Sequence, residues 1–410
     1  MGITISTARL SYLKKPFNPY KELYDSDLQE YSERETQQLA QEDKDDKRAD
    51  WRFQRARRNV KPPTDEDILL SYGLRRELRQ VPRESSGRGR DSQKLLSSNV
   101  VADHIGLVVT YRETIRRAQP KSLPCVFYIH GGGRYGGTPY SGLYLKRAAE
   151  WARNFNAIIF SVDYRLSPNE LDESPTGEEP TNDCFDALKW VYCQLGADGD
   201  EVLRYGDQSK LVVLGTSAGG GLAVSTVMKW CREREQGPKG VMGILSGLIL
   251  EAPQLDDRCN TASHRRFTDG NMFVSGDAIE GWKASLGSRR GSSNVSIFEA
   301  PARARKEDVE NFPPTYIEVG AVEPFKDEVK DFYKVLLTAG VPVELRLWRG
   351  CFHGFFAAAP DVLVSRLCNL SKLRWLSRRL GTHVESIETE YQRAQEEYDA
   401  KADDKKGLSD

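Results

Sequence analysis

The sequence lacks the features that mark several classes of protein. None of its apolar runs approaches the roughly 18 residues of a membrane span, and its N-terminus does not have the basic and then apolar pattern of a signal peptide. The 59 basic and 60 acidic residues almost cancel, so the net charge of -1 favours neither nucleic acid nor an acidic membrane surface as a partner. We therefore expect a cytoplasmic protein with no integral membrane span and no nucleic-acid partner. One short pattern, MGITIS, fits acylation of Gly2, although a single acyl chain anchors a protein only weakly.

Patterns that hold metals, disulfides or nucleotides are also missing. The seven cysteines are an odd, scattered set without C-x-x-C pairs, which fits free thiols in a reducing compartment. No P-loop pattern is present, and no strand leads into a G-x-G-x-x-G followed by an acidic residue about 20 positions later. The sequence therefore predicts no metal site and no cofactor.

Composition divides the chain into three parts. Residues 1–98 are dense in charge and in helix-forming residues, with a mobile linker at residues 81–94, VPRESSGRGRDSQK. Residues 99–381 alternate apolar strands with helices, and residues 382–410 are charged, with apolar residues at helical spacing. We predict an N-terminal extension that docks on a larger α/β domain, and a helical C-terminal tail.

The middle part has the pattern of a mostly parallel central sheet with helices on both faces. Its strands are nearly continuous apolar runs, as expected where both faces of a sheet are covered. In such sheets the chemistry lies beyond the carboxyl ends of the strands. A strand pair is predicted at 99–113, and single strands at 124–130, 157–164, 210–215, 243–253, 315–320 and 343–350. The helices are expected at 141–156, 181–196, 218–235 and 324–340.

One serine stands between a predicted strand and a predicted helix. The segment LVVLGTSAGGGLA contains G-x-S-x-G, formed by Gly215, Ser217 and Gly219. A serine on such a tight turn exposes its hydroxyl above the sheet, and the helix N-terminus favours negative charge that develops there. Ser217 is therefore the candidate nucleophile.

A serine hydroxyl needs a base, and only five histidines are present. His130 precedes the serine, His104 lies in an early strand, His264 lies in a polar segment and His383 begins the tail. His353 follows a predicted strand in the segment WRGCFHGFF, after the serine in the order serine, acid, histidine. His353 is the candidate base.

The acid that orients this histidine is expected between the serine and the histidine. Five carboxylates are available in one segment: Glu318, Glu323, Asp327, Glu328 and Asp331. Glu318 lies inside the predicted strand, whereas Glu323 follows the strand end and precedes Pro324, a residue favoured at the first position of a helix. Glu323 is the predicted acid and Asp327 the alternative, and we expect the others to be solvated helix residues.

The glycine cluster FYIHGGGRYGG, residues 127–137, follows another predicted strand. Acyl transfer needs N–H donors for an oxyanion, and two sources are expected: Ala218 and a glycine loop after an earlier strand. The HGGG stretch at 130–133 fits that loop, with His130 as a structural residue. The Arg134 side chain has two alternatives, because it either faces the substrate entrance or pairs with acids of the N-terminal segment.

Together these motifs resemble the hormone-sensitive-lipase-like group of α/β-hydrolases, which are esterases and lipases. The resemblance rests on HGGG at 130–133, DYRLSP at 163–168, GTSAGG at 215–220, FPPTYIEVG at 312–320 leading into EPFKDE, and FHGF at 352–355. It implies the α/β-hydrolase fold, a helical cap formed by the N-terminal segment, and three site assignments: Ser217 as nucleophile, Glu323 as acid and His353 as base. It also implies the oxyanion donors Gly132, Gly133 and Ala218.

Three positions depart from the pattern of that group. Glu323 stands where aspartate is usual, Arg134 where the group tends to have a bulky apolar residue, and Thr216 where an acidic residue commonly precedes the serine.

The expected function is a serine hydrolase that cleaves carboxylic esters of a small or medium acyl substrate through an acyl-enzyme on Ser217. An alternative is a biosynthetic acyltransferase, cyclase or lyase that uses the same triad on a natural product. A non-catalytic small-molecule receptor is a further alternative, but that branch of the scaffold has lost the histidine that this chain keeps at His353. The expected partner is a small-molecule ester or acyl substrate. The sequence leaves two alternatives for the assembly, a monomer and a homodimer.

Overall fold

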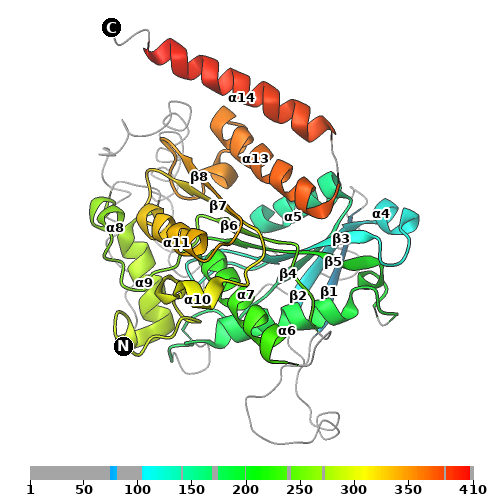
Figure 1. Cartoon of the computed structure of the whole chain (residues 1–410), viewed down its shortest axis with the longest axis horizontal. Coiled ribbons are helices and arrows are strands. Elements are labelled where there is room, and N and C mark those ends of the chain that lie inside the picture. Colours follow the sequence, from blue (N-terminus) through cyan, green and yellow to red (C-terminus); the bar gives the residue numbers. More distant parts are fainter. Residues whose placement is uncertain are drawn as a thin grey trace, which may run out of the picture.

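The computed structural model describes residues 74–80, 104–139, 142–168, 174–198, 200–237, 242–269, 273–382 and 385–406. In this part of the chain one eight-stranded sheet has the order β1-β2-β4-β3-β5-β6-β7-β8 (Figure 1). The strands are β1 (Leu74–Gln80), β2 (His104–Tyr111), β3 (Leu123–Ile129), β4 (Ile158–Val162), β5 (Gly206–Thr216), β6 (Gly247–Glu251), β7 (Thr315–Gly320) and β8 (Val343–Trp348). Strand β2 pairs antiparallel with both β1 and β4, and every other pair is parallel. The predicted mostly parallel sheet is confirmed.

The described part of the predicted strand pair at 99–113 begins at residue 104 and contains one strand, β2. The antiparallel partner of β2 is β1, which comes from the segment assigned to the N-terminal extension. The sheet therefore begins before the predicted boundary at residue 98. The sequence of β1, LRRELRQ, is mostly charged, which edge strands tolerate and a search for apolar runs overlooks. The remainder of the predicted helical cap lies outside the described residues.

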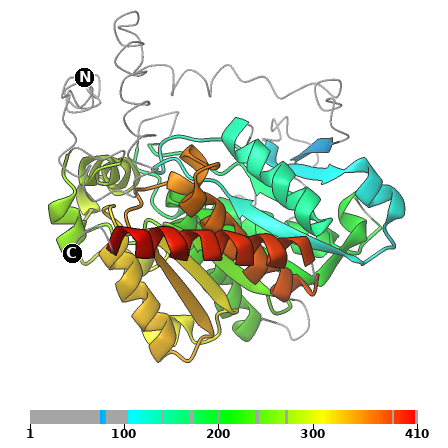
Figure 2. The ribbon, with the colours of Figure 1, turned by 90° about the horizontal axis from the view of Figure 1, so that it is seen from above.

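Helices cover both faces of the sheet. The α-helices are α4 (Arg112–Arg117), α5 (Gly142–Phe155), α6 (Glu179–Gln194), α7 (Ala218–Gln236), α8 (Ala262–Arg266), α9 (Ser275–Leu286), α10 (Lys306–Val309), α11 (Lys326–Thr338), α12 (Phe355–Ala358), α13 (Leu363–Leu380) and α14 (Glu385–Lys406). Short 3-10 turns lie at Leu203–Tyr205, Gly287–Arg289 and Pro301–Arg303. Helices α6, α7 and α11 lie on one face, whereas α5 and α13 lie on the other, and α14 lies along the outer side of α13 (Figures 1 and 2).

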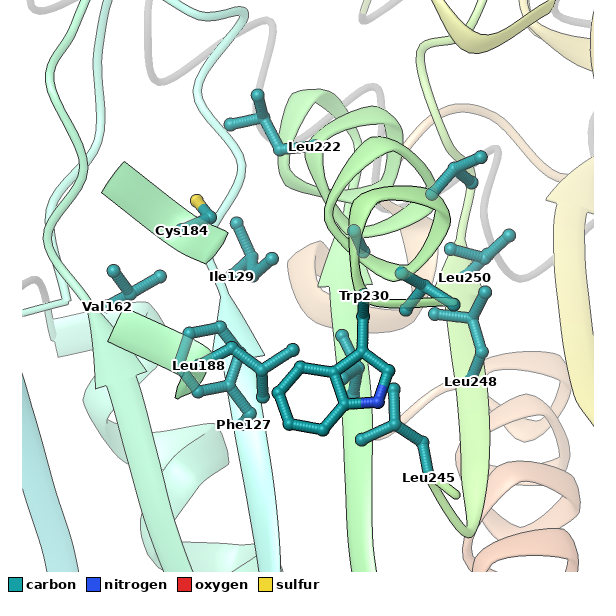
Figure 3. Packing of buried hydrophobic residues seen from close by; sticks show 14 of the residues in the cluster. Phe127, Ile129, Val162, Cys184, Leu188, Leu222, Trp230, Leu245, Leu248 and Leu250 are labelled. Carbon is teal, nitrogen blue, oxygen red and sulfur yellow. The ribbon is translucent and has the colours of Figure 1, made fainter. Parts of the chain in front are cut away.

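Two hydrophobic cores follow from the alternation of side chains along the strands. Phe127 of β3 packs on the side of α6 and α7, while its neighbour Tyr128 packs on the side of α5. Figure 3 shows the first of these cores, where Trp230 of α7 lies among residues such as Leu188 and Leu248. Strands β3, β4, β6 and β7 are buried along their whole length, which explains their continuous apolar runs.

Candidate active site

Ser217 lies on a sharp turn between β5 and α7. Its backbone has φ 55° and ψ -120°, a strained conformation for a residue with a side chain. The flanking glycines are required sterically: a Cβ on Gly215 would lie 2.3 Å from the Gly219 oxygen, and one on Gly219 would lie 2.2 Å from the oxygens of Ile129 and His130. The turn therefore presses closely against the carboxyl end of β3.

His353 lies in the loop after β8, next to Gly354, whose φ of 76° is left-handed. Its Nε2 atom is 2.9 Å from Oγ of Ser217, within hydrogen-bond distance. The rings of Phe273 and Phe325 flank the imidazole, with centroids at 4.6 and 5.1 Å. The structure thus brings the predicted nucleophile and base into direct contact.

Glu323 follows the end of β7 and is fully buried. Both carboxylate oxygens lie 3.3 Å from Nδ1 of His353. The alternative acid, Asp327, is one turn further along and accepts a hydrogen bond from the backbone N–H of Ser263 at 2.8 Å instead. The three residues predicted as a triad are therefore adjacent in space, in the order of a serine–histidine–carboxylate triad.

The glycine loop after β3 lies beside this group. Gly132 and Gly133 have φ of 130° and 63°, and a Cβ on Gly132 would lie only 1.9 Å from the Gly136 oxygen. The N–H of Gly136 donates to the Gly132 oxygen at 2.9 Å and closes the loop into a turn. Ala218, the other predicted donor, begins α7 and is buried. Only glycine permits this backbone path.

His130 is part of the loop framework. Its ring stacks on Tyr164 at 4.4 Å, its Nδ1 lies 2.8 Å from the Gly131 oxygen, and the Tyr164 hydroxyl donates to the His130 carbonyl at 2.8 Å. This environment fits the structural role expected for His130.

The first alternative for the Arg134 side chain is wrong, and the acids of the second lie in the N-terminal segment, outside the described residues. The side chain is buried at 2% exposure, so it does not face an entrance, and its guanidinium lies 3.9 Å from the Trp282 ring centre. Nη2 donates to the backbone oxygen of Glu299 at 3.2 Å. Burial lowers the pKa of Arg134 to about 10.

The expectation that Glu328 is a solvated helix residue is wrong. Glu328 is buried and lies 2.9 Å from Nε2 of His264, while its other carboxylate oxygen accepts the N–H of Leu255 at 2.7 Å. His264, predicted to sit in a polar segment, is buried as well. Ser263 of the same helix donates to the oxygen of Pro324 at 2.6 Å, so α8 clamps the segment that carries Glu323.

A buried ionic cluster beneath Ser217 was missed by the sequence prediction. It consists of Arg147, Glu251, Glu318 and Lys372, all nine-tenths or more buried. Lys372 contacts both glutamates, and Arg147 contacts Glu251. Although burial opposes ionisation, the two cations lower the pKa of Glu251, whereas burial raises the pKa of Glu318. Charged residues inside the apolar strands GLILE and TYIEVG were the available signal.

The cluster is joined to the nucleophile turn at two points. The hydroxyl of Thr216 donates to the Glu251 carboxylate, and the N–H of Ser217 donates to the Glu251 backbone oxygen at 2.8 Å. A carboxylate of the neighbouring strand β6 therefore contacts the residue that precedes the serine.

Other features expected from the sequence can be located as well. All seven cysteines are free thiols. Within the described ranges, no group of three or more His, Cys, Asp or Glu side chains could hold a metal ion, and no helix is long and apolar enough to cross a membrane. A groove of about 840 Å³ lies at the opposite edge of the sheet, near the start of β5, and takes no part in this site.

Known sequences similar to this chain include alpha/beta hydrolases and esterases. A profile for proteins with an alpha/beta hydrolase fold matches residues 126–357. Carboxylesterase NlhH of Mycobacterium tuberculosis is 28% identical over 239 residues, which are 57% of this chain and 67% of that protein. A putative alpha/beta hydrolase of Acanthamoeba polyphaga mimivirus is 26% identical over 242 residues, which are 58% of this chain and 63% of that protein. The chain thus spans less than two thirds of the mimivirus protein.

Solved structures similar to this chain also include esterases. A bacterial heroin esterase is 30% identical, with a TM-score of 0.62 over 81% of this chain and 92% of its own. Esterase LipW from Mycobacterium marinum has the same TM-score at 24% identity, over 88% of this chain and 98% of its own, which supports the fold. Residues 126–357, which the profile matches, include the serine turn, the glycine loop and the histidine loop.

Proposed function

The chain is a carboxylesterase-type member of the alpha/beta hydrolase fold family, and we propose that it cleaves carboxylic esters of small or medium acyl size through an acyl-enzyme on Ser217. The resemblance to hormone-sensitive-lipase-like esterases is confirmed by the family match. The observation that carries the mechanism is the 2.9 Å contact between Nε2 of His353 and Oγ of Ser217, with Glu323 on the other side of the imidazole.

In the acylation step, Oγ of Ser217 attacks the ester carbonyl carbon while Nε2 of His353 takes the hydroxyl proton. The carbonyl oxygen becomes an oxyanion, which accepts hydrogen bonds from the N–H groups of Gly132, Gly133 and Ala218. When the tetrahedral intermediate collapses, the bond to the alcohol oxygen breaks and His353 returns the proton to that oxygen. The alcohol leaves and the acyl group stays on Ser217.

Deacylation repeats the sequence with water. His353 takes a proton from a water molecule, the hydroxide attacks the acyl carbon, and the proton returns to Oγ as the acid leaves. Glu323 holds the imidazole with a proton on Nδ1 and stabilises the imidazolium formed in both steps. The turn at Ser217 is already folded, so little reorganisation accompanies the reaction.

The proposed acyl size rests on the aromatic side chains beside the triad. Phe273 and Phe325 pack against the His353 ring and against each other, with a centroid distance of 5.3 Å. We propose that these rings form one wall of the acyl site. We propose on this basis that short and medium acyl groups are preferred over long ones.

The experiment that tests the function is labelling with a fluorophosphonate probe, followed by turnover of p-nitrophenyl esters of increasing acyl length. Wild-type protein is expected to be labelled on Ser217, and a Ser217→Ala variant to fold normally, resist labelling and lose turnover. Absence of labelling in folded wild-type protein would overturn the proposal. Including alcohols and amines as acyl acceptors separates hydrolysis from acyl transfer or cyclisation by its products.

Two further properties are proposed and open to direct measurement. The seven free thiols support a cytoplasmic location, because a reducing compartment keeps thiols unpaired. Fractionation of cells that produce the protein tests this. Light scattering after size exclusion measures whether the chain forms the homodimer that the sequence left open.

A further inference from the structure

Arg134 carries a buried positive charge, and within the described part of the chain no carboxylate oxygen lies within 4.0 Å of its guanidinium. The nearby acids are engaged elsewhere, since Glu299 pairs with Arg289 and Asp257 pairs with Arg303. The guanidinium is held instead by the Trp282 ring and one backbone oxygen, and its Nε has no hydrogen-bond partner. A buried charge in this condition destabilises a fold.

The charge also lies at the unfavourable end of a helix. A Cβ built on Gly221, in the first turn of α7, would lie 3.4 Å from Nη2 of Arg134. The N-terminus of a helix carries partial positive charge, so a cation there is repelled. The first residue of that helix is Ala218, one of the proposed oxyanion donors.

The Arg134 backbone belongs to the glycine loop, which holds the other proposed oxyanion donors, Gly132 and Gly133. Arg134 directly follows Gly133 and has a left-handed φ of 73°, which costs free energy in a residue with a side chain. Helix α9 packs against this point, because a Cβ on Gly281 would lie 2.1 Å from the Gly133 oxygen. The next residue of α9, Trp282, stacks on the guanidinium. The N–H of Ser167 donates to the Arg134 oxygen at 2.8 Å and holds the loop from the other side.

We propose that Arg134 stabilises, through its electric field, the oxyanion that forms in the hydrolysis of the ester. The inference rests on the proposed function, because it requires a tetrahedral intermediate on Ser217. Three costs coincide at Arg134: a buried charge without an ion pair among the described residues, a position at a helix N-terminus and a strained backbone. All three costs are borne in the resting protein, and a negative charge held by Gly133 and Ala218 offsets the first two only during the reaction.

The expected size of the effect follows from Coulomb's law. A positive charge about 8 Å from the oxyanion, in an effective dielectric constant of about 20, would speed up formation of the oxyanion by roughly thirtyfold. The guanidinium is buried, so we expect no contact with the substrate and almost no change in ground-state substrate binding. Arg134 is therefore expected to act on kcat and on the binding of anionic tetrahedral adducts, and not on KM.

The test compares Arg134→Met and Arg134→Lys with wild-type protein. We expect Arg134→Met to lower kcat about tenfold or more, with KM within about twofold, and Arg134→Lys to keep most of kcat because it keeps the charge. Affinity for an arylboronic acid, which forms an anionic tetrahedral adduct, is expected to fall with kcat. The Tm of Arg134→Met is expected to stay equal or to rise, because a buried charge is removed.

Arg374→Met provides a matched control. Arg374 pairs with Glu388 between α13 and α14, away from the loop, so its loss is expected to leave kcat unchanged. A purely structural role for Arg134 would lower kcat and Tm together and make Lys as poor as Met, and either that result or an unchanged kcat would overturn the inference. If Arg134→Met does not fold, the contrast of Lys with Gln decides the same question.

The two proposals fail in distinguishable ways. If the fluorophosphonate probe does not label wild-type protein, the proposed function itself fails and this inference falls with it. If wild-type protein is labelled and turns over esters while the Arg134 variants match it, only the role of Arg134 is overturned.

Discussion

Both carboxylate oxygens of Glu323 lie 3.3 Å from Nδ1 of His353, and the carboxylate is fully buried. The extra methylene of glutamate, compared with the aspartate usual in this group, therefore does not prevent the acid from reaching the imidazole. The loop position is set by the end of β7 and by α8, which is bonded to the segment after Glu323 through Ser263.

We expect Glu323→Gln to lower kcat by roughly 10³- to 10⁴-fold, because an amide stabilises neither the required tautomer nor the imidazolium. Glu323→Asp is expected to lower it by roughly 10²-fold, since the shorter side chain withdraws the carboxylate by more than about 1 Å. The measurement is kcat per probe-titrated active site. A Gln variant within about tenfold of wild-type activity would show that another group orients His353.

The hydrogen bond from Thr216 to Glu251 predicts a second effect. Replacing Thr216 by Val keeps the side-chain shape but removes the donor to a buried carboxylate, which typically costs about 1–3 kcal/mol. We expect slower fluorophosphonate labelling as well, because Thr216 directly precedes the nucleophile, and Thr216→Ser should recover both properties.

Urea unfolding measures the first of these effects and the labelling rate the second. Thr338→Val is the matched control, because the Thr338 hydroxyl bonds to a backbone oxygen on an exposed part of α11. That change is expected to stay within about 0.5 kcal/mol. Equal behaviour of the two Val variants would mean that Glu251 does not support the nucleophile turn.

The catalytic residues could be predicted from the sequence because each lies in a local pattern at the carboxyl end of a strand. Ser217 is flanked by glycines that the turn requires, and Glu323 and His353 each follow a strand of clear apolar character. In a parallel sheet these ends meet at one edge. Short-range rules were therefore enough to bring together residues that are 136 and 30 positions apart.

Features that depend on packing between distant elements could not be predicted in the same way. The direction of the Arg134 side chain is set by Trp282 and Glu299, far along the chain. Glu251 has the local appearance of a strand end, and its partner Lys372 that of a surface helix residue, so only their contact explains their burial. Strand β1 was missed because pairing with β2, and not apolar character, identifies it.

The contact between α9 and the glycine loop predicts the effect of a single methyl group. Gly281→Ala would place a Cβ 2.1 Å from the Gly133 oxygen, so the loop or the helix must move. We expect kcat to fall by roughly 10²-fold or more, because an oxyanion donor is displaced. Gly276→Ala in the same helix is the control, since a Cβ there meets only one atom, at 3.9 Å.

The measurement is kcat of both alanine variants by steady-state kinetics. Gly276→Ala is expected to keep wild-type kcat, with equal or slightly higher stability, because alanine favours a helix over glycine. If Gly281→Ala keeps full activity, the loop tolerates displacement and its position does not limit the reaction.

The buried ionic cluster predicts a large, pH-dependent effect on stability. Lys372 lies 2.7 Å from Glu251 and also contacts Glu318, so Lys372→Met leaves buried carboxylate charge without this partner. Breaking a buried pair in this way typically costs about 3–5 kcal/mol.

The pH dependence has a definite sign. Burial raises the pKa of Glu318 even with Lys372 present, and losing the cation raises it further. An acid whose pKa is raised on folding contributes stability while it is protonated, and this contribution is lost as the pH rises through the folded-state pKa. The deficit of Lys372→Met is therefore expected to shrink as the pH falls from about 8 to about 5.5.

The double variant Lys372→Met with Glu318→Gln completes this test, because a neutral amide in place of the carboxylate removes the charge that the single variant leaves behind. It is expected to be more stable than Lys372→Met alone at the higher pH and to lose most of the pH dependence. Urea unfolding across this pH range measures all three proteins, wild type included. A single variant whose deficit is independent of pH, or a double variant no better than the single one, would mean that Lys372 contributes through its cation–π contact with Phe356 and not through pairing with the glutamates.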